Sequence, residues 1–348
     1  MKGTRLLLAT GSIFLFVFGL QLLGDSTTAV AEILRGVVKK LVTGDISSLG
    51  AGWILAYLVL NGATSAAIGI AFLQSGIIDT LNTFMFISGS RLGATFIVVF
   101  IGILEYLQGK NDDIRDSCSI GLLQFLTTYA IYIPAIVLGY ISLSTFELSF
   151  LRVSAPAAFN YGLELIFGPF TSILSNVLPP TLLFLVSILT LVVSLRLFDR
   201  SFKGISEESF KSKYVRFRLT DKWAAFAAGS AITLVTTSVA LSVGIIVPLY
   251  NRGYFMRREI IPYLMGANLT TMISSIMAAA VIESAGAMKA TLVLTIAVLS
   301  VTAVALILYD RFYQMIQKTF NTVMLNNTYL YIFTASLVLT PLLLILLF

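Results

Sequence analysis

The chain has 348 residues, of which 57% are hydrophobic and 11% are charged, and its mean hydropathy is +0.94. Soluble domains carry about 25% charged residues, so this composition excludes an ordinary soluble protein and indicates a polytopic membrane protein. The absence of histidine excludes imidazole metal sites and histidine acid–base catalysis, and a single cysteine, Cys118, excludes an intramolecular disulfide.

The net charge of +6 does not indicate a nucleic-acid partner, because many of the basic residues gather in one segment at the end of a predicted span. Eight of them lie there: Arg196, Arg200, Lys203, Lys211, Lys213, Arg216, Arg218 and Lys222. Basic residues between spans are typical of a cytoplasmic loop. Binding of this segment to anionic lipid headgroups is the alternative.

The first apolar run, Leu6–Leu23, follows two basic residues and resembles a signal peptide, with residues 29–31 in the shape of a cleavage site. We favour a retained span, because a signal peptide has an apolar core of about 7–15 residues and this run is longer. The next segment, Thr27–Val42, is charged and amphipathic. We predict a helix lying on the membrane surface there.

Four hydrophobic segments complete the first half. They lie at about 49–73, 77–105, 119–143 and 157–177, with a turn at Gly76 after the first. Pro179-Pro180 then ends any helix. The second half follows the same order, with a span at 181–197, an amphipathic segment at 203–218, hydrophobic segments at about 223–249 and 255–283 around a turn at Gly253, and spans at 286–308 and 328–348.

The two halves are related by a gapless shift of 177 positions. This shift superposes Gly52 on Gly229, Ser65 on Ser242, Gly76 on Gly253, Gly89 on Gly266 and Leu92 on Leu269. Duplicated hydrophobic segments interrupted by glycine indicate the binding site of a secondary transporter. We therefore divide the chain into a first transmembrane repeat, residues 1–177, and a second, residues 178–348.

Each half has about five predicted crossings, an odd number, so the second half enters the membrane from the opposite side. The predicted fold is an all-α polytopic membrane protein with two inverted-topology repeats and broken or re-entrant helices. If a repeat segment is a re-entrant hairpin instead of a span, the sidedness changes.

Polar residues interrupt the apolar repeat segments at similar places and are candidates for a shared site. The candidate substrate-binding residues are Asn61, Gly62, Ala63, Thr64, Ser65, Ser90, Arg91, Thr237, Ser238 and Asn268. A helix unwound at Gly62 or Gly89 presents free N–H groups and the positive end of a helix dipole to an anion. The alternative is that the hydroxyls bond back to their own helix or join neighbouring helices.

The same broken helices offer oxygen atoms to a hard monovalent cation. The candidate sodium-binding residues are Thr95, Thr233, Thr236, Thr270 and Thr271.

Arg91 is the only charged residue between Asn82 and Leu104. A charge at this depth costs about 2.5–3.5 kcal/mol and usually has a partner or a function. Its guanidinium can bind an oxyanion with two parallel hydrogen bonds. The alternatives are an ion pair with Glu105, Glu164 or Glu283, or a side chain that reaches the membrane surface.

Three segments resemble the type II sodium/phosphate cotransporters and their bacterial and archaeal relatives. They are Phe14–Asp25, the stretch Gly266-Ala267-Asn268-Leu269-Thr270-Thr271, and the looser copy Gly89-Ser90-Arg91-Leu92-Gly93-Ala94-Thr95. The family's two Gln-Ser-Ser-Ser motifs are implicated in phosphate and sodium binding. This chain departs from them, with Asn61-Gly62-Ala63-Thr64 in the first half and Ser238-Val239-Ala240-Leu241 in the second.

The resemblance implies a secondary active transporter in the plasma membrane that takes up inorganic phosphate or a similar oxyanion with sodium, bound between the repeats. No cofactor is expected apart from the coupling sodium ion. The alternative is a diverged carrier of another solute, or a membrane interaction protein of the same fold. An enzyme acting on lipid phosphates is not expected, because paired carboxylates and histidine are missing from the spans. The oligomeric state is open, with a homodimer as one option.

Overall fold

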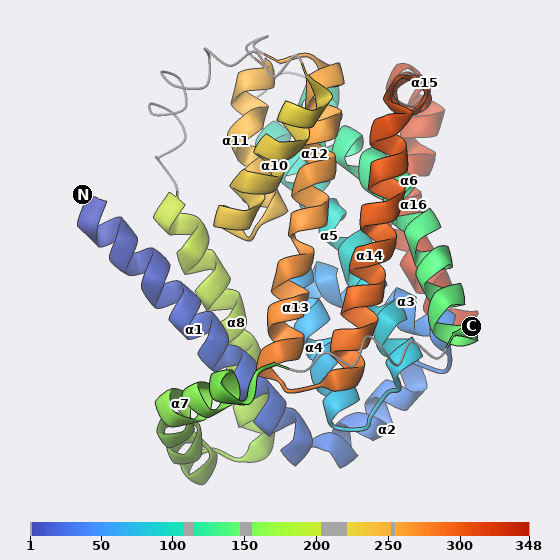
Figure 1. Cartoon of the computed structure of the whole chain (residues 1–348). Coiled ribbons are helices and arrows are strands. Elements are labelled where there is room, and N and C mark those ends of the chain that lie inside the picture. Colours follow the sequence, from blue (N-terminus) through green and yellow to red (C-terminus); the bar gives the residue numbers. More distant parts are fainter. Residues whose placement is uncertain (1, 108–113, 147–154, 203–220, 252–254, 348) are drawn as a thin grey trace.

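The computed structural model describes residues 2–107, 114–146, 155–202, 221–251 and 255–347, and this part of the chain is helical without a strand (Figure 1). The prediction of an all-α polytopic membrane protein is confirmed. Two long helices, α1 (Lys2–Ala29) and α8 (Pro180–Phe202), lie side by side. The predicted amphipathic segment at 203–218 lies outside the described residues.

The first repeat segment is a helical hairpin, which we call the first hairpin. Its arms are α3 (Asp45–Leu58) and α4 (Gly62–Gln74), and the connection includes Leu60 with a φ of 50°. The Ser65 hydroxyl donates to the Gly52 carbonyl at 2.9 Å. Residues 13 apart on a straight helix are separated by about 20 Å, so this bond requires that the chain folds back. α2 (Ala31–Leu41) precedes the hairpin and is bent by 108° from α3.

The first hairpin packs against α5 (Thr80–Leu107) through two glycines. A Cβ atom on Gly52 would lie 2.1 Å from the Phe86 carbonyl oxygen, and one on Gly89 would lie 1.9 Å from the Leu49 carbonyl oxygen. The prediction that the helix could unwind at Gly89 is wrong, because α5 is continuous there. Gly89 is needed for the close approach of two backbones. The predicted helix break at Gly62 is present, because α4 begins there.

The second hairpin consists of α10 (Lys222–Thr236) and α11 (Val239–Asn251), with Thr237 at a φ of 51° between them. It packs on α12 (Arg257–Thr270), which continues into α13 (Met272–Val281). A Cβ atom on Gly229 would lie 2.0 Å from the Tyr263 carbonyl oxygen, and one on Gly266 would lie 2.1 Å from the Phe226 carbonyl oxygen.

Both hairpins therefore share their helix starts, their left-handed residue and their glycine contacts. α3, α4 and α5 begin at residues 45, 62 and 80, and α10, α11 and α12 begin at 222, 239 and 257, each 177 positions later. The left-handed residues Leu60 and Thr237 have the same spacing. In Figure 1 the first hairpin lies in the lower part of the molecule and the second in the upper part. The inverted relation of the complete halves, and the division at residue 177, stay predictions.

The remaining helices surround the hairpins. They are α6 (Ile114–Thr145), α7 (Ala157–Val177), α14 (Ala285–Ile307), α15 (Tyr309–Leu325) and α16 (Asn327–Leu346). The amphipathic helix α15 was not predicted.

Seven helical segments of the described chain are long and apolar enough to cross a membrane, or eight if the bent pair α2 and α3 forms one span. The expectation of about five crossings in each half is therefore wrong. Hairpin arms of 13–15 residues reach only about 20 Å, less than the 30 Å hydrocarbon core.

Candidate anion-binding site

A cavity of about 330 Å³ lies between the tips of the two hairpins. Its lining comes from the first hairpin and α5 (Val59, Leu60, Asn61, Gly62, Ala63, Arg91, Ala94, Ile97, Phe100), from α8 (Val192, Leu195, Arg196, Asp199), and from the second hairpin and the α12–α13 junction (Thr237, Ser238, Val239, Ala240, Thr271). Residues that are about 180 positions apart in sequence thus share one site.

The first tip presents the N-terminus of α4 to this cavity. The Asn61 side chain caps the helix and accepts from the Thr64 amide at 2.9 Å. The amides of Gly62 and Ala63 are in the first turn and have no intrahelical acceptor. Aligned peptide dipoles place a partial positive charge of about half a unit at this end.

The second tip is built in the same way. The Ser238 hydroxyl accepts from the Leu241 amide at 3.3 Å, and the first-turn residues Val239 and Ala240 line the cavity. Asn61 and Ser238 are 177 positions apart and cap corresponding helices. Two helix N-termini from different halves therefore meet at one cavity.

Arg91 is 5% exposed and lies beside both tips. It donates to Thr271 Oγ1 at 3.0 Å, to Ser274 Oγ at 3.4 Å, and to the Ser275 hydroxyl. Its Nε atom is buried without a hydrogen-bond partner.

Among the described residues, Arg91 forms no ion pair. The alternative ion pairs with Glu164 and Glu283 are not formed, and the side chain of Glu105 lies outside the described part of the chain. The guanidinium thus has hydroxyl partners on one side and a cavity on the other.

Among the described residues, the charged ones that line the cavity are Arg91, Arg196 and Asp199, so this lining carries a formal excess of one positive charge. Arg196 is exposed, Asp199 is half-buried, and both belong to α8. The sequence analysis places Arg196 in the basic segment and not in the site. No local pattern predicts its position beside the cavity, because α8 reaches the hairpin tips only in the folded protein.

Six of the ten predicted substrate-binding residues line the cavity, and four do not, namely Thr64, Ser65, Ser90 and Asn268. Ser65 donates to the Gly52 carbonyl and Ser90 to the Ile87 carbonyl at 2.7 Å, while Thr64 is fully buried with Oγ1 unpartnered. Asn268 corresponds to Arg91 by position but lies in another cluster, which is described next.

Asn268 belongs to a buried amide and hydroxyl cluster between α12 and α6. Gln124 Nε2 donates to Asn268 Oδ1 at 2.7 Å, and Asn268 Nδ2 donates to Thr128 Oγ1 at 2.8 Å. Tyr132 donates its hydroxyl to the Asn268 carbonyl at 3.0 Å. Sequence reasoning missed Gln124, although a lone amide in the apolar span 119–143 is a usable signal.

The predicted sodium-binding residues are dispersed. Thr95 donates to the Leu92 carbonyl at 2.7 Å, Thr270 to the Gly266 carbonyl at 2.9 Å, and Thr236 to the Ser238 carbonyl at 3.2 Å. Thr233 is buried with Oγ1 unpartnered. Of these predicted residues only Thr271 lines the cavity, and its hydroxyl accepts from Arg91.

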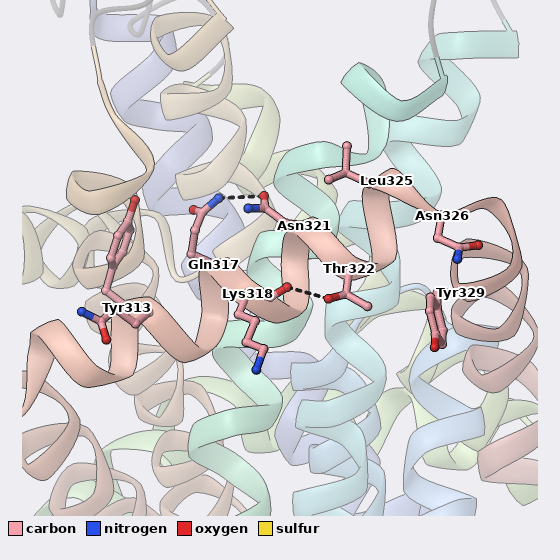
Figure 2. A pocket seen from close by; sticks show the side chains of 9 residues that line it. Tyr313, Gln317, Lys318, Asn321, Thr322, Leu325, Asn326 and Tyr329 are labelled. Atoms are coloured by element: carbon pink, nitrogen blue, oxygen red, sulfur yellow. Dashed lines mark hydrogen bonds between the residues drawn. The ribbon is translucent and has the colours of Figure 1, made fainter.

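A second cavity of about 600 Å³ lies between α15 and the start of α16 (Figure 2). Gln317 donates to Asn321 at 2.9 Å along one side of it, and Thr322 donates to the Lys318 carbonyl at 2.9 Å. Lys318, Asn321 and Thr322 are exposed, so this is a surface groove. It contains none of the predicted site residues.

A comparison with protein-family models gives a match in the first half of the chain. Residues 15–168 match the family model described as Na+/Pi-cotransporter. This part of the chain is similar to that family. The match supports the resemblance predicted from sequence, and the described residues contain seven candidate membrane spans, as expected for a multi-pass membrane protein.

The Na+/Pi-cotransporter match includes the first hairpin, α5 and Arg91, and it ends inside α7. The second hairpin lies beyond it and is connected to it here by the 177-residue correspondence. Comparison with curated proteins and with solved structures gave no match.

Proposed function

We propose that this protein is a secondary active transporter of the plasma membrane that takes up inorganic phosphate, or a similar oxyanion, together with sodium. The anion binds in the cavity between the hairpin tips. Arg91 supports this proposal most directly, because its buried guanidinium has no carboxylate partner among the described residues and faces a cavity bounded by two helix N-termini.

The charge of the site favours an anion. A buried cation without a counter-charge is costly, and a bound anion reduces that cost. Helix N-termini supply N–H donors and positive partial charge, which is the usual arrangement for binding phosphate groups. An oxyanion with four oxygens can accept from both tips and from Arg91 at once.

The size of the site favours a small solute. A cavity of about 330 Å³ is at the lower end of the range of about 300–1,000 Å³ for ligand pockets. It has room for one inorganic oxyanion with several waters, each of which occupies about 30 Å³ in the liquid.

The same tips offer a place for a cation. α3 and α10 end there, so their last carbonyl oxygens and the negative ends of their dipoles lie close to the anion site. Broken helices in sodium-coupled carriers use this arrangement. We propose these carbonyls, with the Thr233 and Thr236 hydroxyls, as sodium ligands.

The test is uptake of radiolabelled phosphate into proteoliposomes with an inward sodium gradient, compared with an inward choline gradient. We expect uptake that needs sodium and increases with an inside-negative potential. Sodium-dependent uptake of radiolabelled sulfate without uptake of phosphate would identify the similar oxyanion as the substrate. Folded protein that takes up neither phosphate nor sulfate under either gradient would refute the proposal.

A further inference from the structure

Arg91 is held by a cluster of three hydroxyl groups. Three hydroxyl oxygens of the second half, from Thr271, Ser274 and Ser275, accept hydrogen bonds from one guanidinium of the first half. Ser274 also donates its own proton to the Thr271 carbonyl at 2.8 Å, so its lone pairs are left for Arg91. The cluster is buried, with exposed fractions of 7% or less.

Neutral oxygen atoms gathered from successive helical turns are the kind of ligand set that a hard monovalent cation prefers. Here the set is filled by a cation that belongs to the chain. Thr271 is a predicted sodium ligand, but its hydroxyl oxygen accepts a hydrogen bond from Arg91 instead. The buried Nε, left without a partner, shows that the hydroxyls do not satisfy the whole guanidinium.

We propose that the Arg91 guanidinium is a tethered cation, which occupies the hydroxyl cluster of Thr271, Ser274 and Ser275 in place of a mobile coupling ion. This inference rests on the proposed function for its consequence in transport. Because this positive charge is covalently attached, binding of an anion requires one mobile cation fewer than binding of the same anion to a cavity that lacks Arg91. The cation also joins the two halves, since its partners lie 180 or more positions away.

The first arm of the test needs no phosphate. Arg91→Ala leaves a cavity lined by three hydroxyls, and Arg311→Ala serves as the matched control, because Arg311 is exposed on α15. Melting temperatures are measured with about 20 mM guanidinium, sodium or choline chloride at equal ionic strength. A cation that binds the vacated cluster raises the melting temperature through binding linkage, by about 3 °C or more in Arg91→Ala alone.

The second arm measures phosphate binding as a function of sodium. We expect the slope of the sodium dependence to rise by about one ion in Arg91→Ala, with phosphate affinity about 10- to 100-fold weaker at low sodium. Guanidinium restores the original slope. An unchanged slope, together with no stabilisation by guanidinium or sodium, would overturn the tethered-cation proposal.

Failure of the two proposals can be told apart. Wild-type protein that binds no phosphate refutes the proposed function. The melting temperatures of Arg91→Ala with and without added cations still test whether the hydroxyl cluster binds a cation. If Arg91→Ala cannot be purified, Arg91→Lys takes its place. Lysine keeps the charge without the planar fork, so we expect weaker phosphate binding with the sodium slope of the wild type. A steeper slope in Arg91→Lys would overturn the inference.

Discussion

Replacement of Gly89 by alanine tests how the first hairpin is packed on α5. The new Cβ atom would lie 1.9 Å from the Leu49 carbonyl oxygen, 2.8 Å from its carbonyl carbon and 3.0 Å from the Trp53 amide nitrogen. Since these are backbone atoms, no side chain can rotate away. α3 and α5 must separate by about 1 Å or more before the contact with the oxygen becomes an ordinary one.

The expected loss follows from two opposing terms. Overpacking costs about 1–3 kcal/mol and sometimes more, and backbone contacts place Gly89→Ala at the upper end. Alanine in a helix recovers about 1 kcal/mol relative to glycine. We therefore expect a net loss of about 2 kcal/mol. Gly11→Ala is the control, because nothing lies within 4 Å of its added Cβ, and there only the helix term remains.

Gly89→Ala and Gly11→Ala should differ by about 3 kcal/mol in the free energy of unfolding, measured by denaturant titration in mixed micelles. Gly266→Ala should behave like Gly89→Ala, because its Cβ would lie 2.1 Å from the Phe226 carbonyl oxygen. Equal stability of Gly89→Ala and Gly11→Ala would refute the close packing. Lost transport without lost stability would instead support unwinding at Gly89.

Two further substitutions test the site and its support. Ser238→Asp keeps the cap on α11, because aspartate is as good an N-cap as serine, but it brings a negative charge to the cavity. Repulsion of about 4 kcal/mol at close range should lower phosphate uptake at least 100-fold, while the melting temperature stays near that of wild type. A stable variant with normal uptake would place the anion elsewhere. Tyr57→Phe removes a hydroxyl that accepts from Trp53 Nε1 at 2.7 Å and donates to the Leu337 carbonyl at 2.9 Å. We expect a loss of about 1–2 kcal/mol in unfolding free energy, against no loss in Tyr331→Phe, whose side chain is 71% exposed.

Much of the fold could be predicted because the membrane leaves few options. A backbone in hydrocarbon must satisfy its own hydrogen bonds, so apolar runs of sufficient length become helices. The predicted segment 157–177 coincides with α7, and 286–308 and 328–348 coincide with α14 and α16 to within two residues. The number of crossings was not predictable in this way, since a re-entrant hairpin and a span have the same composition.

The candidate site was predictable only where the two halves share a signal. Asn61 and Ser238 interrupt their apolar segments at corresponding positions, and both cap helices at the cavity. Ser65 and Ser90 lie in equally polar stretches, yet they bond to backbone carbonyls away from it. Helical periodicity does not tell which face of a buried segment meets the other half of the chain.

The sequence by itself determined a helical membrane protein with a duplicated, glycine-interrupted segment, because hydropathy and the 177-residue repeat are local properties of the chain. Only the tertiary structure decided what the glycines and Arg91 do. Glycine permits both unwinding and close approach, and the position of a second backbone selects between them at Gly89. The partners of Arg91 are three hydroxyls about 180 residues away, which no local pattern connects to it.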